Sequence, residues 1–132
     1  MKVIMGGFVA SEIGKRQYFP QIINPGPKDI DDFLLQVASR HGCISVELED
    51  VPEEADADLT LFSQQGEFLL VLNEKWDTGV VRTFENQTAP NEFVEVHGNV
   101  FHARDLFRDI AIARAALLEF CQRGDVSRTL LK

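Results

Sequence analysis

The sequence predicts an α+β fold, in which a mainly antiparallel sheet of about five to six strands packs two amphipathic helices on one face. Two observations carry this prediction. Apolar residues recur at helical spacing in two separate segments, and the chain between them alternates short apolar runs with short polar turns. With 132 residues, 45% of them hydrophobic, the chain can bury a core, and a single domain over residues 1–132 is expected.

A first strand is expected over residues 3–9. Within it, Gly6 and Gly7 indicate a bulge or a close approach of a neighbouring backbone. Residues 11–24 are expected to form a loop, with room for a short second strand at 18–23.

The first helix is expected to begin at Asn24-Pro25-Gly26-Pro27, with Asn24 as its cap and proline in its first turn. Gly42 is expected to end it. Five apolar residues fall on one helical face and predict its buried side. They are Ile30, Phe33, Leu34, Val37 and Ala38.

The middle of the chain predicts a meander of strands joined by short polar turns, which favours antiparallel pairing. The expected strands are residues 43–48, 59–62, 68–72, 80–84 and 93–96, followed by an edge strand at 101–107. Residues 63–67 are expected to form a hairpin turn, and residues 73–79 a second turn.

The last helix is expected to begin after Asp109 as its N-cap and to end at Gly124. Its buried side is predicted from apolar residues at helical spacing. They are Ile110, Ala113, Leu117, Phe120 and Cys121, with Ile112 and Ala116 widening the stripe. Residues 125–132 are expected to trail off from the helix.

A cytoplasmic location is expected, because charged residues closely follow the short apolar run at the N-terminus and no stretch of about 20 apolar residues occurs. Cys43 and Cys121 are expected to be core thiols, since disulfides are rare in the cytoplasm; a disulfide between them is the alternative.

No pattern in the sequence predicts catalysis, a metal site or a cofactor. His41, His97 and His102 lack the spacing of a metal pair, and no serine lies in a G-x-S-x-G turn. Gly6-Gly7 lacks the further glycines and the lysine of a phosphate-binding loop. We therefore expect a protein that is not an enzyme and that needs no cofactor.

The net charge of −8 argues against nucleic acid and anionic membranes as partners, because both repel an acidic protein. The acidity is concentrated in one part of the chain. Residues 1–28 carry a net charge of +3, residues 29–95 a net charge of −13, and residues 96–132 a net charge of +2. The middle of the chain is therefore expected to form an acidic region.

Seven acidic residues fall within twelve positions, with no basic residue among them. They are Glu47, Glu49, Asp50, Glu53, Glu54, Asp56 and Asp58. One interpretation is a solvated loop whose charge favours solubility. Another is a docking surface for a basic partner, since a concentrated negative field raises association rates with cationic surfaces. A calcium site is disfavoured, because the spacing of an EF-hand loop is missing.

Trp76 is the only tryptophan, and it lies in an expected turn next to acidic residues. It either folds back onto the sheet or serves as an anchor in an interface, where tryptophan is enriched. We therefore include Trp76 with the seven acidic residues as expected partner-binding residues.

Short motifs spread over residues 24–130 match those of a known kind of protein. They are Asn24-Pro25 followed by Ile30, Phe33 and Leu34; Gly66-Glu67-Phe68-Leu69-Leu70-Val71; Val94-Glu95-Val96-His97-Gly98; and Ala103-Arg104, Phe120, Gly124, Ser127 and Leu130. The pattern resembles the small immunity proteins of bacterial polymorphic toxin systems of the contact-dependent inhibition type. It departs from them at His97-Gly98, where the family has a glycine pair, and at Leu130-Leu131, where an aromatic residue is expected.

The resemblance implies a cytoplasmic protein without enzymatic activity that binds a cognate toxin protein, often a nuclease, and blocks it. A basic, nuclease-like toxin domain is therefore the expected partner, bound by a monomer or a homodimer of this chain. A self-associating binding or scaffold domain is the alternative, and a small hydrolase that uses carboxylates or histidines is a third.

Overall fold

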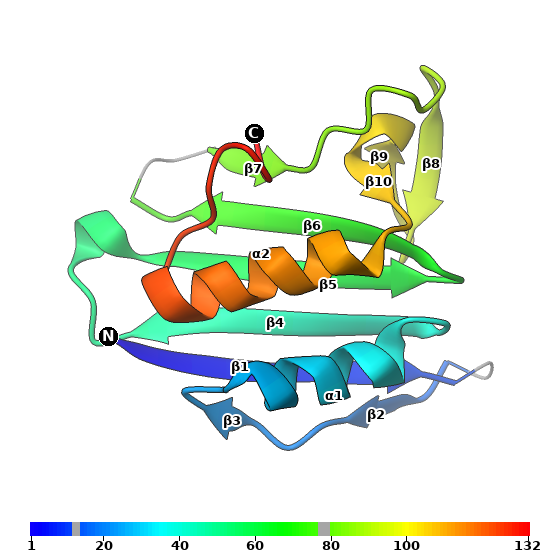
Figure 1. The fold of residues 1–132 in the computed structure, drawn as a ribbon. Coiled ribbons are helices and arrows are strands. Elements are labelled where there is room, and N and C mark those ends of the chain that lie inside the picture. Colours follow the sequence, from blue (N-terminus) through cyan, green and yellow to red (C-terminus); the bar gives the residue numbers. More distant parts are fainter. Residues whose placement is uncertain (12–13, 77–79) are drawn as a thin grey trace.

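The computed structural model describes residues 1–11, 14–76 and 80–132. Its main sheet has eight strands, and every pairing is antiparallel. The strands run in the order β10-β6-β5-β4-β1-β2, with β3 also paired to β1 and β7 also paired to β6 (Figure 1). Their bounds are β1 Lys2–Ala10, β2 Arg16–Tyr18, β3 Ile22–Ile23, β4 His41–Glu49, β5 Ala57–Gln64, β6 Glu67–Glu74, β7 Val81–Thr83 and β10 Leu106–Phe107.

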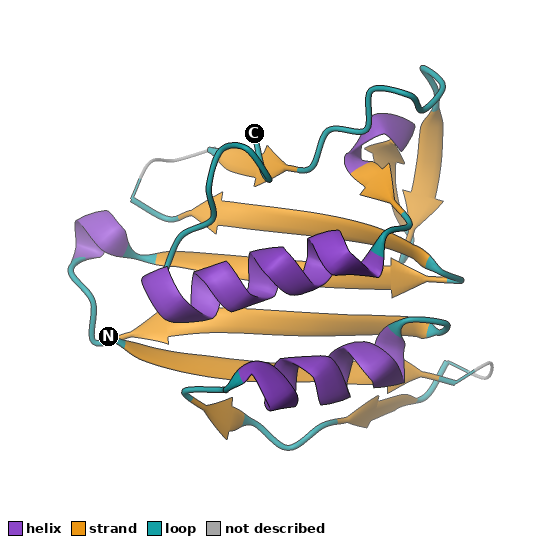
Figure 2. Cartoon of the chain, in the orientation of Figure 1, coloured by secondary structure: helices purple, strands orange, loops and turns teal. Residues whose placement is uncertain are grey.

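Both helices, α1 (Pro27–Val37) and α2 (Ile110–Arg123), lie on one face of this sheet (Figure 2). The α+β prediction is therefore confirmed. The main core lies between the helices and the sheet, and all four buried residues of each helix take part in it. None of the helices in the described part of the chain is long and apolar enough to cross a membrane.

The start of α1 differs from the prediction that Asn24 caps it. Gly26 is the N-cap residue, and its backbone N–H donates to the Asp29 carboxylate at 2.8 Å. Asn24 instead has a positive φ of 50° and accepts a hydrogen bond from the Val3 backbone N–H through Oδ1. Its side chain therefore ties the loop before α1 to strand β1.

The end of α1 also differs, because Gly42 lies in strand β4 and the helix stops at Val37. A Cβ atom at Gly42 would come within 2.8 Å of the Val37 side chain, so glycine lets the helix end pack on the strand.

At Gly7 of β1, a Cβ atom would lie 2.3 Å from the Cys43 carbonyl oxygen, which confirms the predicted close approach of another backbone.

The central hairpin joins β5 and β6 by a turn of two residues, Gln65 and Gly66, rather than five. Both have positive φ, 51° and 84°, which is the backbone of a type I′ turn. This turn matches the right-handed twist of the flanking strands, and it keeps Gln64 opposite Glu67.

The segment after β7 does not continue the main sheet as the meander predicted. Strands β8 (Phe93–Val96) and β9 (Asn99–His102) form a separate two-stranded sheet. Val96 of this hairpin packs on Leu69 and Leu106 in a second, smaller apolar cluster. Between β9 and β10 the chain forms a 3-10 turn, η2 (Ala103–Asp105), in place of one edge strand.

Both ends of α2 follow the prediction. At the start, the Asp109 side chain accepts from the Ala111 N–H at 2.9 Å, and at the end Gly124 has a left-handed φ of 73°. Two residues of the expected stripe are less buried than expected, since Ile110 is 42% exposed and Cys121 is intermediate. Ala116, which was predicted to widen the stripe, is fully buried.

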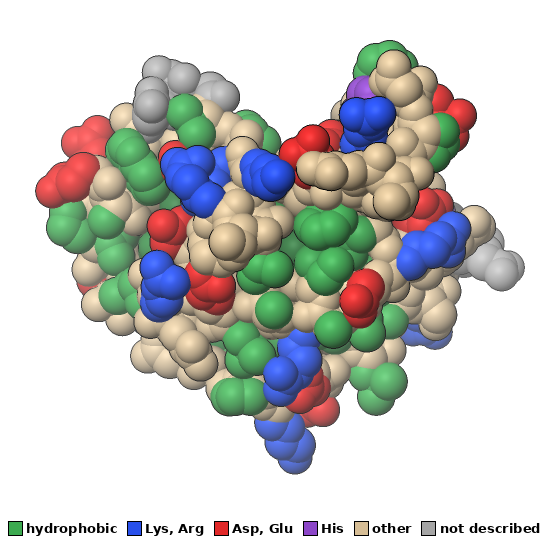
Figure 3. Space-filling view, turned by 45° about the horizontal axis from the view of Figure 1, so that its top comes forward, with side chains coloured by type: hydrophobic (Ala, Val, Ile, Leu, Met, Phe, Trp, Pro, Cys, Tyr) green, Lys and Arg blue, Asp and Glu red, His purple; other side chains and the backbone are tan. Residues whose placement is uncertain are grey.

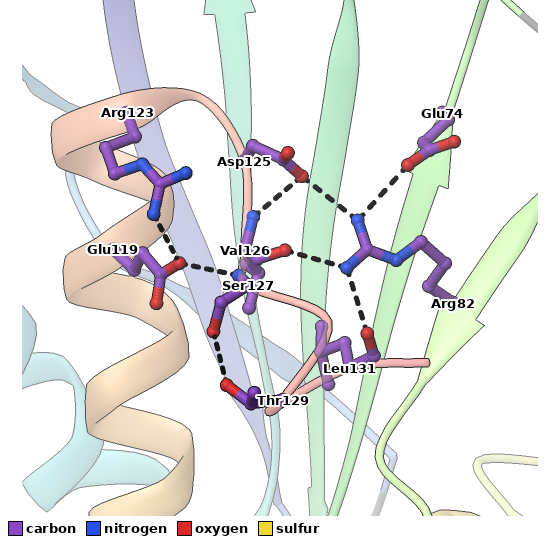
Figure 4. A network of polar contacts seen from close by, with 9 residues as sticks. All are labelled: Glu74, Arg82, Glu119, Arg123, Asp125, Val126, Ser127, Thr129 and Leu131. Atoms are coloured by element: carbon purple, nitrogen blue, oxygen red, sulfur yellow. Dashed lines mark hydrogen bonds and ion pairs between the residues drawn. The ribbon is translucent and has the colours of Figure 1, made fainter.

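Residues 125–132 do not trail off, because Val126 and Leu131 are buried in the core. Arg82, only 2% exposed, holds this segment: its Nη2 donates to the carbonyls of Val126 and Leu131 at 2.7 and 2.9 Å (Figure 4). Its Nη1 contacts Glu74 at 3.2 Å and Asp125 at 3.1 Å. We call Arg82, Glu74, Asp125 and the two carbonyls the Arg82 cluster.

Candidate functional site

The seven acidic residues of positions 47–58 lie together at one end of the sheet, where β4 ends and β5 begins. We call these seven residues the acidic surface. Glu47, Glu49 and Asp58 lie in the strands, and the other four lie in the β4–β5 connection. The structure therefore brings all seven predicted acidic site residues into one region.

The alternation of strand β4 explains why two of these acids face away from the helices. Val46 and Leu48 are buried in the main core, and Glu47 and Glu49 alternate with them and are exposed. Glu47 pairs with Asp58 of β5 and with Ile4 of β1, so these residues share one face. We call the sheet face opposite the helices the open face.

The β4–β5 connection carries the remaining acids. Asp50 begins it with a positive φ of 58°, a conformation that Asp and Asn tolerate better than most residues. Glu53 and Glu54 occupy the first turn of a short 3-10 helix, η1 (Glu53–Ala55), where they are exposed. Asp56 follows, and its Oδ1 is buried without a hydrogen bond from the described residues.

Two of the seven acids form ion pairs. Lys2 Nζ lies 3.4 Å from Glu49, and Lys75 Nζ lies 3.5 Å from Asp58. Within the described ranges, Glu47 and the four acids of the connection have no ion pair. This end of the molecule therefore keeps an uncompensated negative charge.

Trp76 lies at the same end, directly after strand β6. The backbone N–H of Lys75 donates to the Asp56 carbonyl at 3.1 Å, which places the start of this turn beside the acidic connection. The Trp76 side chain is 42% exposed, so it neither folds fully into the core nor stands fully in solvent. It is therefore accessible to a partner that contacts the acidic surface.

A basic region at the opposite end of β4 was not predicted. Lys15 and Arg16 of the β1–β2 hairpin and Arg40, directly before β4, gather there and are exposed. The nine residues of β4 separate the two ends by roughly 27 Å. The net charges of sequence segments do not indicate this region, because Arg40 falls within residues 29–95, whose acidic run at 47–58 lies at the other end of β4.

The acids of α1 belong to neither end. Asp31 accepts from Arg114 Nε of α2 at 2.6 Å, and this hydrogen bond, together with the positive charge of Arg114, lowers the pKa of Asp31 although desolvation opposes the shift. Figure 3 shows this side of the molecule obliquely, with acidic and basic side chains interspersed. The acidic middle of the sequence is therefore divided between two faces, and only residues 47–58 form a single acidic region.

Two depressions of the described surface lie apart from the acidic surface. One, of about 800 Å³, lies at the basic end and is lined by Val9, Ala10, Ser11, Gly14, Lys15, Gln17, Ser39, Arg40, His41 and Gln65. The other, of about 310 Å³, is lined by Thr83, Glu85, His102, Arg104, Asp105 and Lys132.

The three histidines are held by local contacts. His97 Nε2 donates to the Ser63 carbonyl at 2.9 Å, and its ring stacks on His41 at 5.9 Å between centroids. His102 Nδ1 accepts from the Arg104 N–H, and its Nε2 lies 2.7 Å from Asn91 Oδ1. Across the described residues, no group of three or more His, Cys, Asp or Glu side chains is arranged to hold a metal ion.

Both cysteines are free thiols in the structure. Burial raises the pKa of Cys43 to about 11, and it does the same for Cys121. Because the thiolate is the reactive form, neither side chain is activated as a nucleophile at neutral pH.

Comparison with known proteins establishes a family and a fold. A crystal structure of a hypothetical protein from Neisseria gonorrhoeae is similar, with a TM-score of 0.81 and 21% sequence identity over 96% of this chain and 90% of that one. No curated protein matches the sequence. The sequence matches DUF6911, a family of unknown function, over residues 2–130. The chain therefore belongs to the DUF6911 family.

Proposed function

We propose that this protein binds a basic protein partner through the acidic surface and Trp76, and that it acts as an immunity-type inhibitor of a nuclease-like toxin domain. The observation that carries the proposal is the uncompensated charge of the acidic surface, where five acids have no ion pair with any described residue. The resemblance of the sequence to immunity proteins supplies the class of partner.

Uncompensated charge at one place is costly to fold stability, because like charges repel one another when the chain is compact. It is useful for association, because a negative field steers a cationic surface toward it and orients it. A partner that normally binds nucleic acid presents such a cationic surface. The acidic surface would cover that site and exclude the natural substrate.

The mechanism is occlusion without chemistry. Neither of the two depressions described above overlaps the acidic surface. Trp76, at 42% exposure, offers apolar area beside the charges, which is the usual composition of an interface anchor.

The experiment is capture of the partner from the native cell by the tagged protein, followed by mass spectrometry. The proposal expects one basic protein with a nuclease-like domain to be enriched by the wild type. The substitution Glu47→Lys, combined with Glu53→Lys and Glu54→Lys, should abolish the enrichment, because these three side chains are exposed and have no described ion pair.

A matched control separates this surface from net charge. The triple variant Asp32→Lys, Glu92→Lys, Glu95→Lys makes the same change in net charge at exposed positions outside the acidic surface. It should capture the partner as the wild type does. Equal loss in both variants would mean that overall charge, and not this surface, attracts the partner.

A further inference from the structure

On the open face of the sheet, the kind of side chain changes along the strands, from basic at one end to acidic at the other. Residues paired across strands share a face, and the same face recurs at every second residue. The register therefore sorts the open face into rows, in order along the strands. They are a basic row (Arg16, Ala10, His41), an aromatic row (Tyr18, Phe8, Cys43, Phe62), a small row (Gly6, Ser45, Thr60) and an acidic row (Ile4, Glu47, Asp58).

The β8–β9 hairpin covers only part of this face. Val94, Val96 and Phe101 pack on the outward side chains of β5, β6 and β10, where Leu69 and Leu106 are buried. On β4, the His97 ring stacks on His41, and Cys43 is buried. The part of the face on β1, β2 and the middle of β4 is less covered, since Ile4, Phe8 and Ser45 are half-buried and the Tyr18 side chain is 67% exposed.

We propose that this uncovered part of the open face docks a basic protein segment that also carries an apolar side chain. The lysine or arginine residues of the segment pair with the acidic row, and its apolar side chain packs beside Tyr18 and Phe8 in the aromatic row. The inference rests on the proposed function and names the kind of segment that the same partner presents.

Charge complementarity selects this occupant over a second copy of the chain. Two copies each carry a net charge of −8 and repel one another, whereas a basic segment is attracted both by the whole molecule and by the acidic row. In that row Asp58 is paired with Lys75, whereas Glu47 is exposed and has no ion pair with a described residue.

The rows also fix the direction of the bound segment. The Arg16 guanidinium stacks over the Phe8 ring at 4.3 Å from its centroid, so positive charge stands at the aromatic end of the face. It repels cationic side chains from that end and leaves the acidic row as their position. Ser45 of β4 belongs to the small row, which lies between the aromatic row and the acidic row. Its side chain is short, so it leaves room for a segment that contacts both rows.

The register sets the spacing that the partner must match. Cys43 and Glu47 lie four residues apart on β4, which places the aromatic and acidic rows about 13 Å apart. A segment with its apolar side chain next to its basic residues cannot occupy both rows at once. An experiment can therefore vary the spacing between the apolar and basic side chains of a peptide while its amino-acid composition stays the same.

The probes are two synthetic peptides of identical composition, blocked at both ends. In one, a tryptophan precedes a pair of lysines by four residues; in the other, it is adjacent to the pair. Each is titrated into the isotopically labelled protein while backbone amide shifts are recorded. We expect the spaced peptide to bind about tenfold more tightly, with shifts at Gly6, Ser45 and Thr60.

Substitutions at two exposed residues test the aromatic row and the acidic row separately. Tyr18→Ala should bring the two peptides to equal affinity, because it removes apolar contact but no acidic charge. Glu47→Gln should weaken both peptides. The matched controls are Leu35→Ala and Asp32→Asn, an exposed leucine and an exposed acid on α1, which should change nothing.

Equal affinity of the two peptides for the wild type would overturn the inference, as would shifts confined to the β4–β5 connection. Loss of binding in Glu53→Gln, Glu54→Gln with no effect of Tyr18→Ala or Glu47→Gln would also overturn it, while the proposed function would stand. If no acidic substitution changes binding, the acidic surface is not a docking site and both proposals fail.

Discussion

The Arg82 cluster and the acidic surface place charge in opposite ways. In the cluster, Arg82 is 2% exposed, and its two terminal nitrogens meet two carboxylates and two carbonyls. At the acidic surface, five exposed or half-buried carboxylates have no described ion pair. The Arg82 cluster attaches the C-terminal segment to the sheet, whereas the five carboxylates of the acidic surface form no ion pair that joins two parts of the described chain.

This difference shows which charges stabilise the fold and which are free to act outside it. A buried charge that loses its partner is strongly destabilising, so the members of the Arg82 cluster depend on one another. An exposed charge contributes little to stability, so the acidic surface can change without loss of the fold. Substitutions in the two regions should therefore separate stability from binding.

The largest effect is expected from Arg82→Met. It leaves Glu74, whose side chain is 9% exposed, as a buried carboxylate without its cation. The free energy of unfolding should fall by about 3–5 kcal/mol, as measured by urea denaturation. A loss below 1 kcal/mol would show that the cluster does not hold the fold together.

Leu131→Ala should have the next largest effect on stability, because Leu131 is fully buried in the main core. We expect a loss of about 2–5 kcal/mol, the usual range for truncating a buried leucine, because a cavity is left in the core. The same denaturation experiment measures it. A neutral result would mean that residues 125–132 are only loosely attached.

The triple variant Glu47→Lys, Glu53→Lys, Glu54→Lys should leave stability within about 0.5 kcal/mol of the wild type. Any change should be toward higher stability, because the substitutions relieve repulsion among neighbouring carboxylates. The thermal unfolding midpoint checks this at low salt, where such repulsion is least screened. A large loss of stability would assign these charges to the fold instead.

The smallest effect is expected from Asp31→Asn on the helix face. Arg114 lowers the pKa of Asp31 in the folded state below its unfolded value, so the pair stabilises the fold at neutral pH. That contribution is lost as pH falls through the lowered pKa, below about pH 4. Wild type and variant should therefore differ slightly at pH 6 and converge near pH 2 in their unfolding midpoints.

Local chemistry was enough to predict much of the fold from the sequence. The cap at Asp109 and the end of α2 at Gly124 depend on neighbouring residues alone. The contacts of Arg82 could not be predicted, because its partners Asp125 and Leu131 lie 43 and 49 residues away in sequence. The buried C-terminal segment was missed for the same reason.

The candidate site shows the same limit. The acidic run was visible as seven carboxylates in twelve positions, but its division between the open face and a connection depends on the register of β4. The alternation of Val46 and Leu48 with Glu47 and Glu49 was the available signal. The basic region formed by Lys15, Arg16 and Arg40 needed the β1–β2 hairpin and the start of β4 to be placed side by side.

The rate of association with the captured basic partner, measured against salt concentration, tests the central claim most directly. The wild type and the Asp32→Lys, Glu92→Lys, Glu95→Lys control should associate rapidly at low salt and slow steeply as salt rises. The Glu47→Lys, Glu53→Lys, Glu54→Lys variant should associate at least about tenfold more slowly at low salt, with a flattened salt dependence. Identical rates and salt slopes for all three proteins would contradict the claim that the acidic surface is the docking site.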